Sequence, residues 1–223
     1  MKAPDTHPYS RLTPDVVLNA LDALGLRCDG RLLSLNSYEN RVYQVGQEEG
    51  LPLVAKFYRP ARWSEKQILE EHAFASELAE AEVPVVAPIV LNERTLHDFE
   101  GFAFAVYPRQ GGRAPELEDP KALEWIGRFI GRIHAIGGTA AYRVRPAIDI
   151  ASFGDEPRRF LVEHRFIPTE LMEAWTSIAD LALEGVRAAF ARTGKYASLR
   201  LHGDCHAGNV LWKIGRASCR ERV

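Results

Sequence analysis

Short apolar runs separated by polar turns occupy the first half of the chain, and this alternation is typical of β-strands. The runs are 32–35, 41–45, 53–58, 87–91 and 102–107. Polar turns at 36–40 and 47–50 join the first three runs, which predicts an antiparallel meander. The last two runs complete a predicted five-stranded sheet.

Two helices are predicted in the same half from the residues at their ends. Thr13 is a suitable N-cap for the first helix, and Gly25 ends it. Ser64 and Gln67 have the spacing of a capping box, which predicts a second helix over 64–81. The first half therefore combines a sheet with two helices.

The second half of the chain is predicted to be helical. Residues 108–112 break the strand pattern and are typical of a hinge between two lobes. A helix over 119–137 and a longer one over 169–190 follow, each with apolar residues at helical spacing. The expected buried stripe of the first of these helices is Leu123, Ile126, Ile130 and Ile133. The pattern predicts an α+β protein with a β-rich lobe followed by an α-rich lobe.

The composition is that of an ordinary globular protein, and it argues against several classes of protein. The chain has 28 Lys and Arg against 30 Asp and Glu, so nothing indicates a nucleic-acid partner. No run approaches the roughly 18 consecutive apolar residues of a membrane span, and the N-terminus lacks the apolar stretch of a signal peptide. The three cysteines, Cys28, Cys205 and Cys219, lack metal-ligand spacing. We expect a monomeric cytoplasmic protein with no nucleic-acid or membrane partner.

The strongest chemical signal lies at 201–209, which reads Leu-His-Gly-Asp-Cys-His-Ala-Gly-Asn and is the candidate catalytic loop. It fits the His-x-Asp-x-x-x-x-Asn pattern of a kinase catalytic loop. Phosphoryl transfer needs a carboxylate that accepts the proton of the attacking hydroxyl and oxygen ligands for Mg²⁺. Asp204 is the candidate carboxylate and Asn209 the candidate metal ligand, while His202 is expected to bond the backbone and hold the loop. The alternative is a polar turn in which Asp204 and Asn209 serve only turn geometry.

With His-Gly-Asp in place of His-Arg-Asp, this loop resembles the aminoglycoside phosphotransferase and choline kinase superfamily. Three further stretches, 35–44, 56–60 and 68–72, resemble a bacterial branch of Ser/Thr protein kinases that act in stress response. The resemblance spans about 13–212. It implies a bilobal protein-kinase-like fold, with a small antiparallel β-rich N-lobe and an incomplete α-rich C-lobe. It also implies that ATP and Mg²⁺ are used to phosphorylate a protein Ser or Thr. Two alternatives stay open, a small-molecule kinase for an amino alcohol or antibiotic, and a nucleotide-binding pseudokinase that docks partners.

Two charged residues match the next parts of such a site. A kinase holds the α- and β-phosphates of ATP with a lysine on its third strand, and Lys56 lies on the predicted strand 53–58. This lysine pairs with a glutamate of the following helix, and Glu71 is the candidate because it lies on the apolar face of 64–81. By the same spacing Glu70 and Glu77 face solvent more. The alternatives are a surface lysine whose stem covers the sheet and an ordinary surface carboxylate.

The turn 36–40 stands where protein kinases have a Gly-rich loop, although it contains no Gly-x-Gly. Backbone N–H groups of a tight turn and the Ser37 hydroxyl can bind phosphate oxygens, and by resemblance Ser37 contacts ATP. An ordinary hairpin turn is the alternative. The adenine-facing edge is expected over 104–108, from backbone groups and apolar walls.

The end of the chain departs from the resembled family. That family has a second Mg²⁺-binding aspartate about ten residues beyond the asparagine, whereas no aspartate follows Asp204 here. Residues 214–223 resemble the translation of a sequencing adapter, so we expect a gene fragment read into adapter sequence, inactive and poorly soluble as it stands. We therefore predict an N-lobe over 1–108, a truncated C-lobe over 109–213 and a non-native tail over 214–223.

Overall fold

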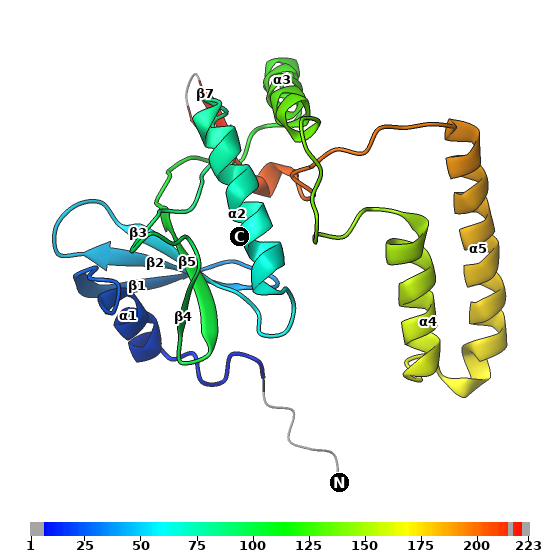
Figure 1. Cartoon of the computed structure of the whole chain (residues 1–223), viewed down its shortest axis with the longest axis horizontal. Coiled ribbons are helices and arrows are strands. Elements are labelled where there is room, and N and C mark those ends of the chain that lie inside the picture. The colour runs from blue at the N-terminus through cyan, green and yellow to red at the C-terminus, as the bar shows by residue number, and fades with distance from the viewer. Residues whose placement is uncertain (1–6, 214–215, 220–223) are drawn as a thin grey trace, which may run out of the picture. The chain divides into compact units, whose positions relative to one another are not determined.

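The computed structural model describes residues 7–213 and 216–219. Its main feature is a five-stranded antiparallel sheet with the strand order β1-β2-β3-β5-β4 (Figure 1). The strands are β1 (Cys28–Leu35), β2 (Arg41–Gln47), β3 (Leu53–Phe57), β4 (His97–Phe99) and β5 (Phe102–Pro108). The predicted antiparallel sheet and the predicted α+β class are confirmed.

The fourth strand is not the one predicted. Residues 87–91 form no strand of the sheet, although Ile89 N–H donates to the Val106 carbonyl at 2.7 Å. Pro88 lies in the middle of this segment and has no N–H to donate, which prevents a continuous ladder. The segment therefore follows β5 without joining the sheet.

The strand that takes this place, β4, is set by a tight turn. Glu100 and Gly101 connect β4 to β5, and both have positive φ, at 50° and 80°. Two successive residues with positive φ give the turn whose twist matches antiparallel strands. The signal is weak in the sequence because Glu100 is an unusual residue for this conformation.

Each face of the sheet is covered by one helix. Helix α1 (Pro14–Asp22), capped by Thr13, packs with Phe57 and Phe104, whose rings stack at 5.0 Å. Helix α2 (Glu65–Glu80) begins with the predicted capping box and buries Ile68 in a second cluster with alternate strand residues. Because side chains alternate along a strand, β3 presents Phe57 to the first cluster and Lys56 to the opposite face.

Helix α3 (Pro120–Gly137) occurs as predicted and buries Ile133 of the expected stripe, but its other buried residues differ from those predicted. Its buried residues are Ala122, Phe129, Ile133 and Gly137. Leu123, expected inside, is 50% exposed. The sequence periodicity fits both stripes, and the small residues Ala122 and Gly137 permit a closer approach than larger side chains would.

The chain divides into two compact units, one of 1–141 with 199–223 and one of 142–198. The segment around the candidate catalytic loop thus belongs with the sheet and α3. The predicted boundary between lobes at 108/109 does not coincide with the boundaries of these two units, and it stays a prediction. In the described residues, no helix has the length and apolar character needed to cross a membrane.

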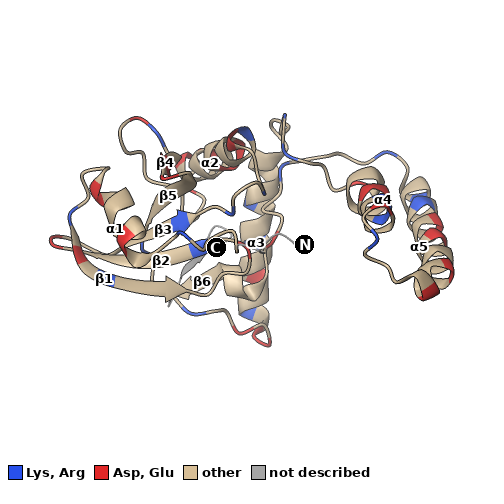
Figure 2. Ribbon diagram, turned by 90° about the horizontal axis from the view of Figure 1, so that it is seen from below, with Lys and Arg blue, Asp and Glu red and all other residues tan. Residues whose placement is uncertain are grey.

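The unit 142–198 consists of η1 (Ala151–Asp155), α4 (Glu156–Glu163), η2 (Thr169–Leu171) and α5 (Met172–Thr193). The long helix predicted over 169–190 is therefore confirmed, with its first turn in the 3-10 conformation. Acidic and basic residues are interspersed along α4 and α5 (Figure 2). Arg158 pairs with Asp180 at 2.6 Å, and Arg187 pairs with Asp155.

A short turn, η3 (Ala207–Asn209), leads into a two-stranded sheet of β6 (Val210–Lys213) and β7 (Arg216–Cys219). A short strand thus directly follows the candidate catalytic loop. Trp212 exchanges two backbone hydrogen bonds with Arg113, at 2.7 and 3.1 Å, which joins β6 to the segment after β5. Of the proposed tail, 214–215 and 220–223 lie outside the described residues, and its adapter origin stays a prediction.

Candidate functional site

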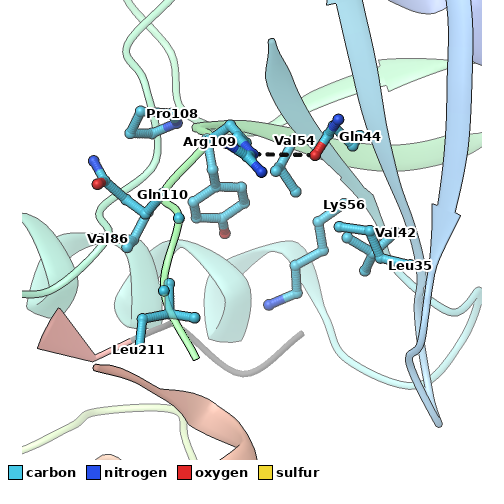
Figure 3. A pocket seen from close by; sticks show the side chains of 13 residues that line it. Leu35, Val42, Gln44, Val54, Lys56, Val86, Pro108, Arg109, Gln110 and Leu211 are labelled. Atoms are coloured by element: carbon cyan, nitrogen blue, oxygen red, sulfur yellow. Dashed lines mark hydrogen bonds between the residues drawn. The ribbon is translucent and has the colours of Figure 1, made fainter. Parts of the chain in front are cut away.

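A cavity of about 190 Å³ lies beside the sheet (Figure 3). Val42 and Val54, which line it, belong to the cluster on the face that α1 does not cover. Val42, Val54 and Lys56 line it from the sheet, and the chain from Tyr107 to Gly112 forms its edge. A dry cavity of about 150 Å³ accepts one benzene ring, so this volume suits a flat heterocycle rather than a whole nucleotide. The C-terminal end of the segment 104–108, which is expected to face adenine, thus borders the cavity.

The strand after the catalytic loop reaches the same cavity through Leu211. A Cβ atom at Gly112 would lie 2.9 Å from Leu211 Cβ, which is closer than two such atoms come. Glycine at 112 therefore allows β6 to approach the hinge segment. In Figure 3 the Lys56 side chain extends toward the space beside Leu211, two residues beyond Asn209.

Lys56 and Glu71 are brought together as the sequence suggested. Lys56 Nζ lies 3.4 Å from Glu71 Oε1, and the Lys56 side chain is 4% exposed against 23% for Glu71. The ammonium also lies over the Tyr58 ring, 4.8 Å from its centroid. A lysine is seldom buried without a partner, because removing its charge from water is costly. The glutamate and the aromatic ring compensate for that cost and direct the ammonium along the cavity wall.

A buried polar network joins α2 to the sheet behind Lys56. The Tyr58 hydroxyl is hydrogen-bonded to His72 Nε2 at 2.7 Å and to the Tyr107 hydroxyl at 3.0 Å. His72 Nδ1 is hydrogen-bonded to Thr95 Oγ1 at 2.9 Å. This network was not predicted from the sequence, although a histidine directly after Glu71 on a predicted apolar face was an available signal.

The catalytic-loop candidates also lie together. Asn209, 7% exposed, donates from Nδ2 to the Asp204 carbonyl at 2.8 Å and to Asp204 Oδ2 at 3.0 Å. Asp204 N–H donates to His202 Nδ1 at 3.3 Å, which is the kind of backbone contact expected of His202. Gly203 has φ 79°, a conformation that a residue with a Cβ adopts at a cost. These bonds fix the orientation of the Asp204 carboxylate.

Ser37 lies in the turn between β1 and β2 and does not line the cavity described above. Its Oγ is buried and has no hydrogen-bond partner among the described residues. The turn is held from outside: Glu39 accepts from Trp63 Nε1 at 2.9 Å and from Arg62 at 3.1 Å. A buried hydroxyl without a partner is rare in a folded protein. It fits a position that a phosphate oxygen would complete, although the turn has no Gly-rich sequence.

Glu77 was expected to face solvent more than Glu71, and its side chain is indeed the more exposed, at 40%. It is nevertheless engaged, because it forms a two-point ion pair with Arg200. The Arg200 hydrogen bonds hold the pKa of Glu77 below its usual range, against the opposing effect of desolvation. No sequence signal connected these residues, which are 123 positions apart.

The residues present fit a magnesium site only in part. Asn209 offers an amide oxygen, a ligand that Mg²⁺ accepts. Among residues 7–212, no group of three or more His, Cys, Asp or Glu side chains is placed to hold a metal ion. Any Mg²⁺ at Asn209 would thus take its other ligands from substrate phosphates and water, as this ion commonly does.

The chain is similar to a known enzyme family over most of its length. A model of the phosphotransferase enzyme family matches residues 31–219. Stress response kinase A of Escherichia coli (strain K12) is 44% identical over 207 residues, which are 93% of this chain and 62% of the relative. The serine/threonine protein kinase RdoA of Salmonella typhimurium (strain LT2) is 43% identical over the same shares. The chain thus spans about 62% of the length of these curated relatives.

Solved structures of similar fold include two kinases named for small molecules. An amicoumacin kinase in complex with AMP-PNP, Ca²⁺ and Ami has a TM-score of 0.70 at 19% identity, over 94% of this chain and 64% of that one. A microcompartment-associated aminopropanol kinase has a TM-score of 0.68 at 17% identity, over 92% and 68%. At these identities the likeness shows the fold alone, which is the bilobal kinase-like fold. The family match covers most of the chain, including the sheet and the 201–209 loop, and the chain therefore belongs to the phosphotransferase enzyme family.

Proposed function

We propose that the protein is an ATP- and Mg²⁺-dependent kinase that transfers the γ-phosphate of ATP to a hydroxyl group. One observation carries the proposal: a buried lysine paired with a helix glutamate lines the same cavity as Leu211, which directly follows the Asp204–Asn209 loop. Phosphoryl transfer requires a positive charge that binds the phosphates and a carboxylate that orients the acceptor hydroxyl.

Each residue has a distinct task in this proposal. Lys56, held by Glu71, binds the α- and β-phosphates, and Ser37 donates its hydroxyl to a phosphate oxygen. Asp204 orients the acceptor hydroxyl and takes its proton as the new oxygen–phosphorus bond forms and the bond to the β-phosphate oxygen breaks, which releases ADP. Mg²⁺, held by Asn209 and the phosphates, would offset the phosphate charge.

We propose a Ser or Thr side chain of a protein as the acceptor. The proposal is supported by relatives at 43–44% identity that are named stress response kinase A and serine/threonine protein kinase. A small hydroxyl-bearing molecule is the second candidate, because the solved neighbours include kinases of amicoumacin and aminopropanol. The monomeric state and the cytoplasmic location stay predictions.

Transfer of radiolabelled phosphate from γ-labelled ATP tests the function. The assay compares the 223-residue chain and the longest natural reading frame that contains residues 1–213, with protein substrates and a panel of small alcohols, and the variant is made in the longer protein. We expect Asp204→Ala to lower transfer by at least a factor of about 10² and to change nucleotide affinity by less than about threefold. Equal transfer by Asp204→Ala and wild type would contradict the catalytic assignment.

A further inference from the structure

Arg200, four residues before Asp204, is buried and makes contacts with two helices. Its guanidinium donates to both carboxylate oxygens of Glu77, at 2.6 and 2.9 Å, and lies over the Phe74 ring, 4.4 Å from the centroid. These two residues belong to α2. It also donates to the Ile136 carbonyl at 3.1 Å and to Thr139 Oγ1 at 3.2 Å, at the end of α3.

The backbone of Arg200 is fixed at the same place. Its N–H donates to the Gly137 carbonyl at 3.1 Å. A Cβ atom at Gly137 would lie 2.1 Å from the Arg200 carbonyl oxygen, so only glycine permits this approach. The entrance to the 201–209 loop is therefore held both by its side chain and by its main chain.

The partner of this anchor is the helix that also carries Glu71. Glu77 follows Glu71 by six residues on α2, which is about 9 Å along a helix axis at about 1.5 Å per residue. A helix is rigid over that length. Helix α2 therefore holds Arg200 through Glu77 and Lys56 through Glu71 at a fixed separation. The two-point geometry of an Arg–carboxylate pair sets orientation as well as distance.

We propose that Arg200 and Glu77 are positioning residues that hold the Asp204 loop in register with the Lys56–Glu71 pair. The inference rests on the proposed function, because that function places the Asp204 loop and the Lys56–Glu71 pair on the same bound nucleotide. The pair acts through α2 and touches neither nucleotide nor acceptor. Loss of the pair should therefore lower kcat and leave nucleotide affinity unchanged. Unfolding of the site would lower both.

The first test is Glu77→Gln, which keeps the shape of the side chain and removes its charge. In the longer natural protein that contains residues 1–213, we expect kcat for phosphoryl transfer to fall about tenfold or more, because small misplacements of a catalytic group are costly. The affinity for a fluorescent ATP analogue and the KM for ATP should stay within about twofold, since Lys56 and Glu71 are unchanged. Glu80→Gln, an exposed carboxylate on the same helix, is the matched control and should change neither quantity.

A second variant tests the anchor without removing a charge. Gly137→Ala should displace the Arg200 backbone and give the same separation of kcat from nucleotide affinity. Gly131→Ala is its control, because a Cβ at that position of α3 meets no atom within 4 Å. Equal losses of nucleotide affinity and kcat in Glu77→Gln, or no loss of either, would overturn the proposal.

Hydrogen exchange separates this proposal from the wider function. Glu77→Gln should speed amide exchange at 200–209 at least severalfold, with no change in the β3 and β5 strands. Unchanged exchange at 200–209 overturns the anchoring role even if the protein is a kinase. Conversely, faster exchange in this variant, together with no phosphate transfer by the longer natural protein, would keep the anchor and reject the kinase function.

Discussion

At the scale of single residues, the site is organised by two cations that are almost withdrawn from water. Lys56 is paired with Glu71 and faces two aromatic rings, whereas Arg200 is paired with Glu77 and covers Phe74. Both carboxylates come from α2. One helix thus fixes a cation on the sheet and a cation before the catalytic loop.

Replacing Lys56 by Met keeps most of the buried stem and removes the charge. We expect the affinity for ATP to fall about tenfold or more, equivalent to about 1.4 kcal/mol, because the phosphates lose their buried cation. Titration with a fluorescent ATP analogue measures this, and Lys66→Met, an exposed lysine of α2, is the control. Unchanged affinity in Lys56→Met would contradict the assignment of this residue.

The Glu77–Arg200 pair also predicts a dependence of stability on pH. The pKa of Glu77 is lowered in the folded protein by its bonds to Arg200. The pair's contribution to the free energy of unfolding is therefore complete above the pKa of Glu77 in the unfolded chain. It is lost as pH falls through the lower pKa of Glu77 in the folded protein. Urea unfolding from pH 7 to pH 3 should show wild type and Glu77→Gln farthest apart near neutrality and converging in acid. A constant difference at every pH would contradict this linkage.

At the scale of elements, α2 is held on the sheet by a polar network as well as by apolar packing. The Tyr58 hydroxyl lies at its centre and contacts both His72 and Tyr107. Because buried polar groups are costly to leave without partners, such a network favours one position of the helix over its neighbours. The position of Glu71 depends on that choice.

Replacing Tyr58 by Phe removes one hydroxyl from this network. We expect the free energy of unfolding to fall by about 1–3 kcal/mol, since His72 loses a partner in a buried place. Tyr43→Phe on β2 is the matched control, and urea unfolding monitored by tryptophan fluorescence is the measurement. Equal stability of the two variants would show that the network contributes little.

Residue patterns predicted those elements whose signals are local. The capping box at Ser64 and the lysine of the third strand could be found because each lies within one short segment. Three features could not be found in this way. The choice of β4 depends on a turn with a glutamate at positive φ, the buried stripe of α3 depends on what it packs against, and the Arg200–Glu77 pair joins distant segments.

At the scale of the whole molecule, the candidate site lies within one compact unit of the chain. The segment 199–213 returns to the sheet and α3 after the separate unit 142–198. The two segments that flank the unit 142–198 lie close together, because Arg200 donates to the Gly137 carbonyl and to Thr139. Nucleotide binding should therefore depend on the first unit alone.

Replacing 142–198 by a flexible Gly/Ser linker of about six residues tests this independence. The variant should bind a fluorescent ATP analogue within about threefold of the wild-type affinity, since every residue assigned to the nucleotide is retained. The same replacement with Lys56→Met is the control and should bind about tenfold more weakly. Loss of binding in a variant that still unfolds cooperatively would contradict the assignment of the site to one unit.

The central claim is that Lys56, Asp204 and Asn209 share one magnesium-bound nucleotide. A crystal structure of the protein with a non-hydrolysable ATP analogue and Mg²⁺ tests it most directly. We predict Lys56 Nζ within about 3 Å of a phosphate oxygen, Asn209 Oδ1 on the metal and Asp204 facing the γ-phosphate. A nucleotide bound away from Lys56, or phosphates that point away from the 201–209 loop, would contradict the account.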